Sequence, residues 1–239
     1  MAEESPGEGG RAVADVRSPV RSGLADAAPL LVGLVPFALV LGALAARKGL
    51  SPFEVMLMSG IVFAGGSQFV AVELWRDPVP LGLLALMALL VNCRHLLMGA
   101  ALAPHATGWG PRAWPALFFM ADEVWALSLR RAAGREVPLG YWYGIALGLW
   151  CNWVALTGFG AWLGSGIEDP ARLGFDFAFV AVFIALLRGM WRGRATLAPW
   201  LASALTAALV HYLFPGPWYV AAGALAGLAA AVLTAEPDA

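Results

Sequence analysis

The sequence predicts an all-α, polytopic integral membrane protein, and three observations support this prediction. Hydrophobic residues make up 60% of the 239 residues and charged residues only 13%, and the mean hydropathy is +0.73. A soluble domain carries about a quarter of charged residues. The apolar residues also fall into long runs, and the stretches between these runs are short and rich in Gly, Pro and charge. Such a pattern is typical of membrane helices and their connecting loops.

Eight apolar segments can be separated along the chain, and we expect about eight transmembrane or re-entrant helices. The segments occupy residues 24–46, 52–75, 79–103, 113–129, 139–163, 175–191, 197–213 and 218–234. Residues 33–74 and 148–187 both read as a Gly-rich helix, a polar connection and a second apolar helix. This similarity indicates a weak internal repeat, although Gly-rich membrane helices resemble one another without any repeat.

The basic residues orient the chain in the membrane. Residues 1–22 lack the apolar core of a signal peptide, so we expect a flexible cytoplasmic tail ahead of a transmembrane domain over residues 23–235. With eight crossings, ten basic residues then lie on the cytoplasmic face and four on the outer face, which places both termini in the cytoplasm. The cytoplasmic set is Arg11, Arg17, Arg21, Arg76, Arg130, Arg131, Arg135, Arg188, Arg192 and Arg194, and the outer set is Arg47, Lys48, Arg112 and Arg172.

The second segment carries Gly65, Gly66, Ser67 and Gln68 near its middle. Adjacent glycines weaken a helix, so one interpretation is a broken helix whose freed backbone groups face a substrate cavity. The other interpretation is that the glycines permit close helix packing while the polar side chains form interhelical hydrogen bonds. The spacing alone does not choose between them.

The third segment carries Asn92, Arg94 and His95 inside a run of apolar residues. A charged guanidinium at the centre of a membrane helix costs roughly 2.5–3.5 kcal/mol on the insertion scale, so it marks a site. Helical spacing places Asn92 and His95 on one face and Arg94 on another. Arg94 could bind a substrate anion, with His95 as a proton acceptor. The alternative is that Arg94 is the fixed counter-ion of an intramembrane acid.

The fourth segment offers such acids, because Asp122 and Glu123 stand about halfway along it. One carboxylate could face Arg94 while the other faces a cavity and carries a proton. The alternative is a shorter segment with both acids at the membrane surface. Asp176, at the start of the sixth segment, is either a helix cap or a further ligand.

Several single residues support narrower expectations. Pro29 and Pro36 predict a kink in the first helix, and Asn152 predicts an interhelical hydrogen bond. Cys93 and Cys151 lie in apolar segments, so we expect small packing residues rather than a disulfide.

Several classes of protein are disfavoured. The net charge of −1 argues against a nucleic-acid partner. The sequence has no Walker A loop, no G-x-S-x-G and no H-E-x-x-H, and its three histidines are widely separated. We therefore expect no metal, no cofactor and no enzyme, although an intramembrane enzyme is a distant alternative. A polar-cavity channel for ions or small solutes is a nearer one, but no ring-forming filter motif is visible, which favours a carrier.

Four short motifs resemble, in order and spacing, the AzlC-type permeases, the large subunits of branched-chain amino-acid exporters. The resemblance implies proton-driven export of hydrophobic amino acids across the bacterial cytoplasmic (inner) membrane, with a small hydrophobic AzlD-like membrane subunit as partner. We expect substrate binding by the polar residues of the second and third segments, and proton coupling or ion pairing by His95, Asp122, Glu123 and Asp176. The motifs are residues 64–69, 92–98, 122–127 and 176–179.

Overall fold

The computed structural model describes residues 18–132, 135–166, 197–214 and 218–234, together with single positions at 184, 188, 191, 193 and 194. Every regular element in these ranges is a helix, so the predicted all-α class is confirmed. The predicted sixth segment and Asp176 lie largely or wholly outside the described residues. Helix α1 begins at Pro19, which is earlier than the boundary at residue 23 predicted for the end of the tail.

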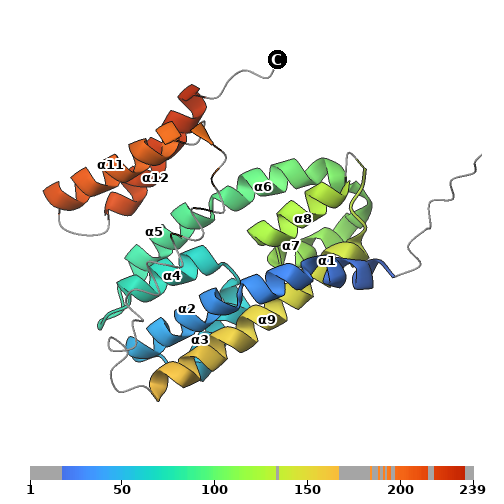
Figure 1. The fold of residues 1–239 in the computed structure, drawn as a ribbon, viewed down its shortest axis with the longest axis horizontal. Helices are drawn as coiled ribbons and strands as arrows, with labels where there is room; N and C mark the ends of the chain where they lie inside the picture. Colours follow the sequence, from blue (N-terminus) through green and yellow to red (C-terminus); the bar gives the residue numbers. More distant parts are fainter. Residues whose placement is uncertain are drawn as a thin grey trace, which may run out of the picture. The chain divides into compact units, whose positions relative to one another are not determined.

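The chain divides into two compact units, shown as ribbons in Figure 1. Unit 1 comprises Met1–Gly33 and Leu96–Asn152, and unit 2 comprises Leu34–His95 and Trp153–Ala239. Each unit is therefore built from two stretches that are far apart in the sequence. The long helix α9 (Leu139–Ser165) contributes its first part to unit 1 and its second part to unit 2.

Unit 1 is organised around the buried indole of Trp142. The Nε1 of Trp142 donates to the carbonyl of Ala116 at 3.0 Å, and the ring of Trp109 packs edge-on with centroids 5.0 Å apart. The helices of this unit are α1 (Pro19–Gly33), α6 (Arg94–Leu102), η1 (Ala103–His105), η2 (Thr107–Arg112), α7 (Ala113–Phe118), α8 (Asp122–Ala132) and the first part of α9.

Unit 2 has α4 at its centre, packed against α2, α3 and α5. Helix α3 begins with a capping box, in which the Ser51 hydroxyl accepts from the amide of Glu54 and the Glu54 carboxylate accepts from the amide of Ser51 at 2.7 Å. Helices α11 and α12 form a closely packed pair. The helices of this unit are α2 (Val35–Arg47), α3 (Pro52–Val62), α4 (Gly65–Leu74), α5 (Leu81–Asn92), the second part of α9, α11 (Leu197–Leu213) and α12 (Trp218–Thr234).

In unit 1, α1 and the first part of α9 run in parallel and in close contact. A Cβ added to Gly144 would lie 2.2 Å from the carbonyl oxygen of Val20. Further along both helices, Asn152 donates to the carbonyl of Leu31 at 3.1 Å, which confirms its predicted interhelical bond. Leu31 belongs to the last turn of α1, where carbonyls lack an intrahelical partner, so Asn152 supplies one.

In unit 2, α2 and the second part of α9 are also parallel and in close contact. A Cβ on Gly160 would lie 2.4 Å from the carbonyl oxygen of Leu39, and one on Gly164 would lie 2.8 Å from the Cα of Ala43. Small residues allow two helix backbones to approach in this way, which is a common basis of association in membranes.

Four of the predicted segments are interrupted. The first breaks at Leu34, two residues before Pro36, as expected for a proline that cannot bond the preceding turn. The second breaks between α3 and α4, and the third breaks at Cys93. The fourth, predicted as one helix, is instead the pair α7 and α8, so that prediction is wrong. A break before Asp122 places its charge beside free helix amides instead of inside a continuous apolar helix.

Fewer helices could cross a membrane than the eight predicted segments. Within the part of the chain that the structure describes, Leu81–His105 and Leu139–Ser165 are each long and apolar enough, and the pair α1–α2 is a third if it counts as one span. Helices α3, α11 and α12 are apolar but shorter. Large apolar side chains such as Leu96 and Trp114 are about 80% exposed (78% and 81%), as a lipid-facing surface requires. Both cysteines are free, as predicted, but exposed rather than packed.

Replacing Gly160 with Ala should destabilise the protein, because the new Cβ would clash with the carbonyl of Leu39. Overpacking of this kind costs about 1–3 kcal/mol. Gly82 is the matched control, since nothing lies within 4 Å of a Cβ at that position. We expect purified Gly160→Ala protein to melt at a lower temperature in detergent than Gly82→Ala protein. Equal melting temperatures would contradict the close packing of α2 against α9.

Candidate functional site

The break in the second segment is set by two unusual backbone conformations. Phe63, which ends α3, is left-handed with φ 32° and ψ 49°, and Ala64 has φ −142° and ψ 85°. A left-handed conformation costs a residue with a Cβ about 1–2 kcal/mol. The helix is therefore broken, as the first interpretation expects, and α4 begins immediately afterwards at Gly65. The interhelical hydrogen bonds of the second interpretation are also present, so the two are compatible, and a substrate cavity at the break stays a prediction. Strain of this kind is typical of functional positions.

The break leaves the first turn of α4 open. The amides of the first helical residues have no carbonyl one turn earlier, and Ala64 provides no side-chain cap. A Cβ on Gly65 would lie 3.1 Å from the Trp153 ring, and one on Gly66 would lie 3.6 Å from the Nη2 of Arg94. Gly65 thus lets an indole approach the helix start closely, and the guanidinium of Arg94 lies within van der Waals reach of the next position.

The polar residues of the third segment also reach this turn. Asn92 donates through Nδ2 to the Ser67 hydroxyl at 3.2 Å, and Ser67 in turn donates to the carbonyl of Ala64 at 3.0 Å. The Nδ1 of His95 lies 3.0 Å from the carbonyl of Asn92. Because Arg94 reaches neighbouring Gly66, the prediction that Asn92 and Arg94 face separate surfaces is wrong. The interruption at Cys93 and the length of the arginine side chain allow both to converge.

One acceptor in this cluster has no hydrogen bond. The Oδ1 of Asn92 is buried and, among the described residues, has no partner. Buried polar atoms are nearly always satisfied, and leaving one unsatisfied costs about 1–3 kcal/mol. An unsatisfied acceptor beside open helix amides and a guanidinium is the arrangement expected of a site that receives a ligand with both a cationic and an anionic group.

Gln68, the residue after Ser67, is buried and forms hydrogen bonds with other side chains of the protein. It is 1% exposed, its Nε2 donates to the Ser59 hydroxyl at 2.9 Å, and its Oε1 accepts from the Nε1 of Trp153 at 2.9 Å. The hydroxyls of Ser59 and Thr157 are also bonded at 2.9 Å. This buried network ties α4 to α3 and α9, so Gln68 holds the helix start in place.

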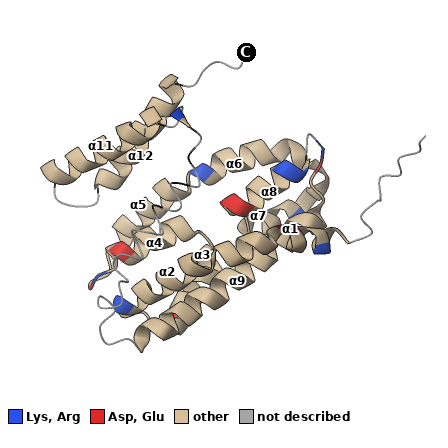
Figure 2. Cartoon of the chain, viewed as in Figure 1, with Lys and Arg blue, Asp and Glu red and all other residues tan. Residues whose placement is uncertain are grey.

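The acidic pair of the fourth segment begins α8. Asp122 is exposed and Glu123 half-buried, and both lie in the first turn, while Arg130 and Arg131 lie in the last turn. Figure 2 shows this acidic start and basic end. The order complements the helix dipole. Trp125 anchors α8, since its Nε1 donates to the carbonyl of Met98 at 3.0 Å.

The structure therefore gathers five of the predicted site residues in unit 2, and these are Gly65, Gly66, Ser67, Asn92 and Arg94. The acidic pair belongs to unit 1, so the predicted pairing with Arg94 stays a prediction. Asp176 lies outside the described residues. Sequence reasoning missed Ser59, Trp153 and Thr157. Ser59 and Thr157 are polar residues within the apolar helices α3 and α9, and this could have indicated a buried hydrogen bond.

Comparison with known proteins decides the family. The family model described as AzlC protein matches residues 29–167, which include Arg94, Asp122 and Glu123. The chain belongs to the AzlC family. Asp176 falls outside the matched range. No solved structure showed significant similarity to the chain.

Three relatives of this AzlC family member extend the comparison. Inner membrane protein YgaZ of Escherichia coli K12 is 30% identical over 221 residues, 89% of each chain. A protein of Archaeoglobus fulgidus described as an uncharacterized membrane protein is 29% identical over 216 residues, 87% of this chain and 91% of its own. The Bacillus subtilis 168 branched-chain amino acid transport protein AzlC is 27% identical over 173 residues, 72% of this chain and 67% of its own.

Replacing Gln68 with Leu should destabilise the protein by about 1–3 kcal/mol, because the Trp153 indole and the Ser59 hydroxyl each lose a buried partner. Adding Trp153→Phe removes the orphaned indole donor and should recover part of that loss. Thermal melting of the two single variants and the double variant tests this. If the double variant loses the sum of the two single effects, the two side chains are not directly coupled.

Proposed function

We propose that this AzlC family member is a secondary active transporter of branched-chain or other hydrophobic amino acids. We further propose that it acts in export, is coupled to protons and is not an enzyme. The Bacillus subtilis relative is named as a branched-chain amino acid transport protein, which supports the substrate class. The observation that carries the site is the open first turn of α4 next to the guanidinium of Arg94.

The chemistry of this cluster matches a zwitterion. The amides of Gly65 and Gly66 and the positive end of α4 favour a carboxylate, and the planar fork of Arg94 can bond both of its oxygens. The Oδ1 of Asn92 is a buried acceptor suited to an ammonium group. Ser67 orients Asn92, and Gln68 fixes the turn that presents the amides.

Proton coupling requires groups that exchange a proton at membrane depth. We assign this role to His95, whose Nδ1 lies 3.0 Å from the carbonyl of Asn92, and to Asp122 and Glu123 at the start of α8. An imidazole and a carboxylate can each bind and release a proton. Asp176 is the remaining candidate.

The partner and the orientation are also proposals. The resemblance to AzlC-type permeases supports a small hydrophobic AzlD-like subunit and a bacterial cytoplasmic membrane, with both termini in the cytoplasm. Within the chain, only 11% of the apolar stretch of 18 residues in Leu81–His105 is buried. A helix this apolar and this uncovered needs lipid or a second hydrophobic chain around it.

Arg94→Ala should weaken substrate binding, because charge-assisted hydrogen bonds contribute about 1.5–3 kcal/mol each, which corresponds to a rise in KM of roughly 10- to 100-fold. Initial efflux of labelled leucine from preloaded cells that express the chain with its partner measures this. Immunoblotting of membranes controls for the amount of protein, and Arg76→Ala, at an exposed position, is the matched control. Unchanged efflux would remove Arg94 from the site.

Replacing Asp122 with Asn and Glu123 with Gln together should weaken the dependence of efflux on external pH, because neither amide can carry a proton. Efflux is compared over about two pH units around neutrality. Glu73→Gln, which neutralises an exposed acid, should keep the parental profile. A double variant with that same profile would refute the proton role of the pair.

A further inference from the structure

We propose that residues 52–75 and 113–132 form two re-entrant hairpins, each of which enters the membrane and leaves by the face through which it entered. This inference requires only that the chain is a membrane protein, and it does not depend on the proposed function. It places both candidate motifs, Gly65–Gly66 and Asp122–Glu123, just after the tip of a hairpin.

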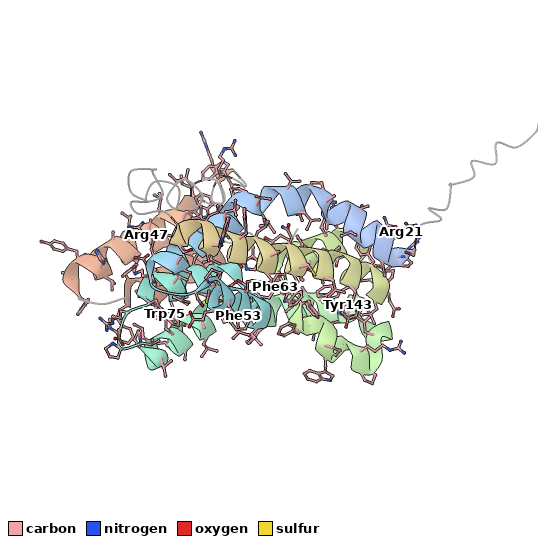
Figure 3. All side chains as sticks on the ribbon, turned by 90° about the horizontal axis from the view of Figure 1, so that it is seen from below. Arg21, Arg47, Phe53, Phe63, Trp75 and Tyr143 are labelled. Carbon is pink, nitrogen blue, oxygen red and sulfur yellow. The ribbon has the colours of Figure 1, made fainter. Side chains whose placement is uncertain are left out.

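The first hairpin is defined by a contact between its two ends. Lys48, which follows α2, donates through Nζ to the carbonyl of Glu73 in the last turn of α4 at 2.9 Å. A continuous helix over residues 52–74 would separate its ends by roughly 35 Å. Arg47 and Trp75 accordingly lie toward one end of the view in Figure 3, and Phe63, at the break, lies farther from that end.

The arms of this hairpin have the length of half a membrane. Helix α3 has 11 residues and α4 has 10, and helices of this length rise about 15 Å, half of the 30 Å hydrocarbon core. The bond from Gln68 to Ser59 joins the two arms close to the tip. The buried network therefore satisfies polar groups at the depth where water is scarce, as non-helical backbone in a membrane requires.

The second hairpin closes in the same way. The amide of Val137 donates to the carbonyl of His105 at 2.8 Å, the Nε1 of Trp109 donates to the carbonyl of Val137 at 2.8 Å, and Thr107 donates to the Glu136 carboxylate. The chain that precedes α7 is thus bonded to the chain that follows α8. A continuous helix over residues 113–132 would hold these two loops roughly 30 Å apart.

The parallel packing of α1 and α9 supports two re-entrant segments rather than one. Two parallel helices begin on the same face, so the four segments up to residue 132 must include an even number of crossings. One re-entrant segment would leave three crossings and make the helices antiparallel. Two re-entrant segments leave two crossings, the α1–α2 pair and Leu81–His105, both of which are long enough to span.

The distribution of basic residues agrees with this topology. Relative to the eight-crossing scheme, Arg76 moves to the outer face and Arg112 moves to the cytoplasmic face. These two changes cancel, so ten basic residues remain inside and four outside, and the positive-inside rule is satisfied equally well. The charges alone could not have separated the two schemes.

Cysteine labelling tests the proposal. In full-length protein with Cys93 and Cys151 replaced by Ala, single cysteines are placed at Ser51 and Val79 for the first hairpin, and at Pro111 and Pro138 for the second. A membrane-impermeant maleimide is applied to intact cells and to inverted vesicles. Gly166→Cys, paired with Pro138→Cys, flanks the spanning helix α9 and must label from the opposite face. Labelling after denaturation measures the amount of each variant.

We expect Ser51→Cys and Val79→Cys to label only in intact cells, and Pro111→Cys and Pro138→Cys to label only in inverted vesicles. Arg47→Cys gives a second position before the first hairpin if Ser51→Cys disturbs the cap of α3. Labelling of Ser51 and Val79, or of Pro111 and Pro138, from opposite faces would overturn the corresponding hairpin. Neither result depends on transport, so failure here is distinct from failure of the proposed function.

Discussion

The structure depends on the rule that backbone polar groups inside a membrane must be satisfied by the protein or by a ligand. At the tip between α3 and α4 this rule operates in two ways. Behind the tip, the side chains of Ser59, Gln68, Trp153 and Thr157 form hydrogen bonds with one another. In front of it, the first α4 turn has no side-chain cap, and the Oδ1 of Asn92 has no hydrogen-bond partner among the described residues. The division between satisfied and open groups is what distinguishes the scaffold from the site.

The strained conformation of Phe63 is consistent with this division. A left-handed phenylalanine persists only when its surroundings hold it in place, and its side chain is buried at 7% exposure. The hydrogen-bonded network that follows it along α4 supplies that support. Gly65 then lets the Trp153 ring approach the backbone closely, so the geometry of the turn depends on both the support and this small residue.

Local sequence patterns predicted local features well. Pro36 predicted the interruption of the first helix, Asn152 predicted an interhelical bond, and Gly65 with Gly66 offered the broken helix as one of two interpretations. The pair α7 and α8 was not predicted, because an apolar run of suitable length reads as one crossing. What decides its path is a contact between Thr107 and Glu136, which are remote in the sequence, and no periodicity carries that information. The convergence of Asn92 and Arg94 was missed for a related reason, since helical spacing assumes an uninterrupted helix.

The parallel direction of α9 and its neighbours has an electrostatic consequence. Two helices that lie side by side in the same direction bring like ends of their dipoles together, and this opposes association. In the low dielectric of a membrane such repulsion is poorly screened. The close contact at Gly160 and Gly164 adds dispersion forces, which fall off far more steeply with separation than the repulsion does. The stability of this helix pair is thus especially sensitive to the size of the residues at the contact.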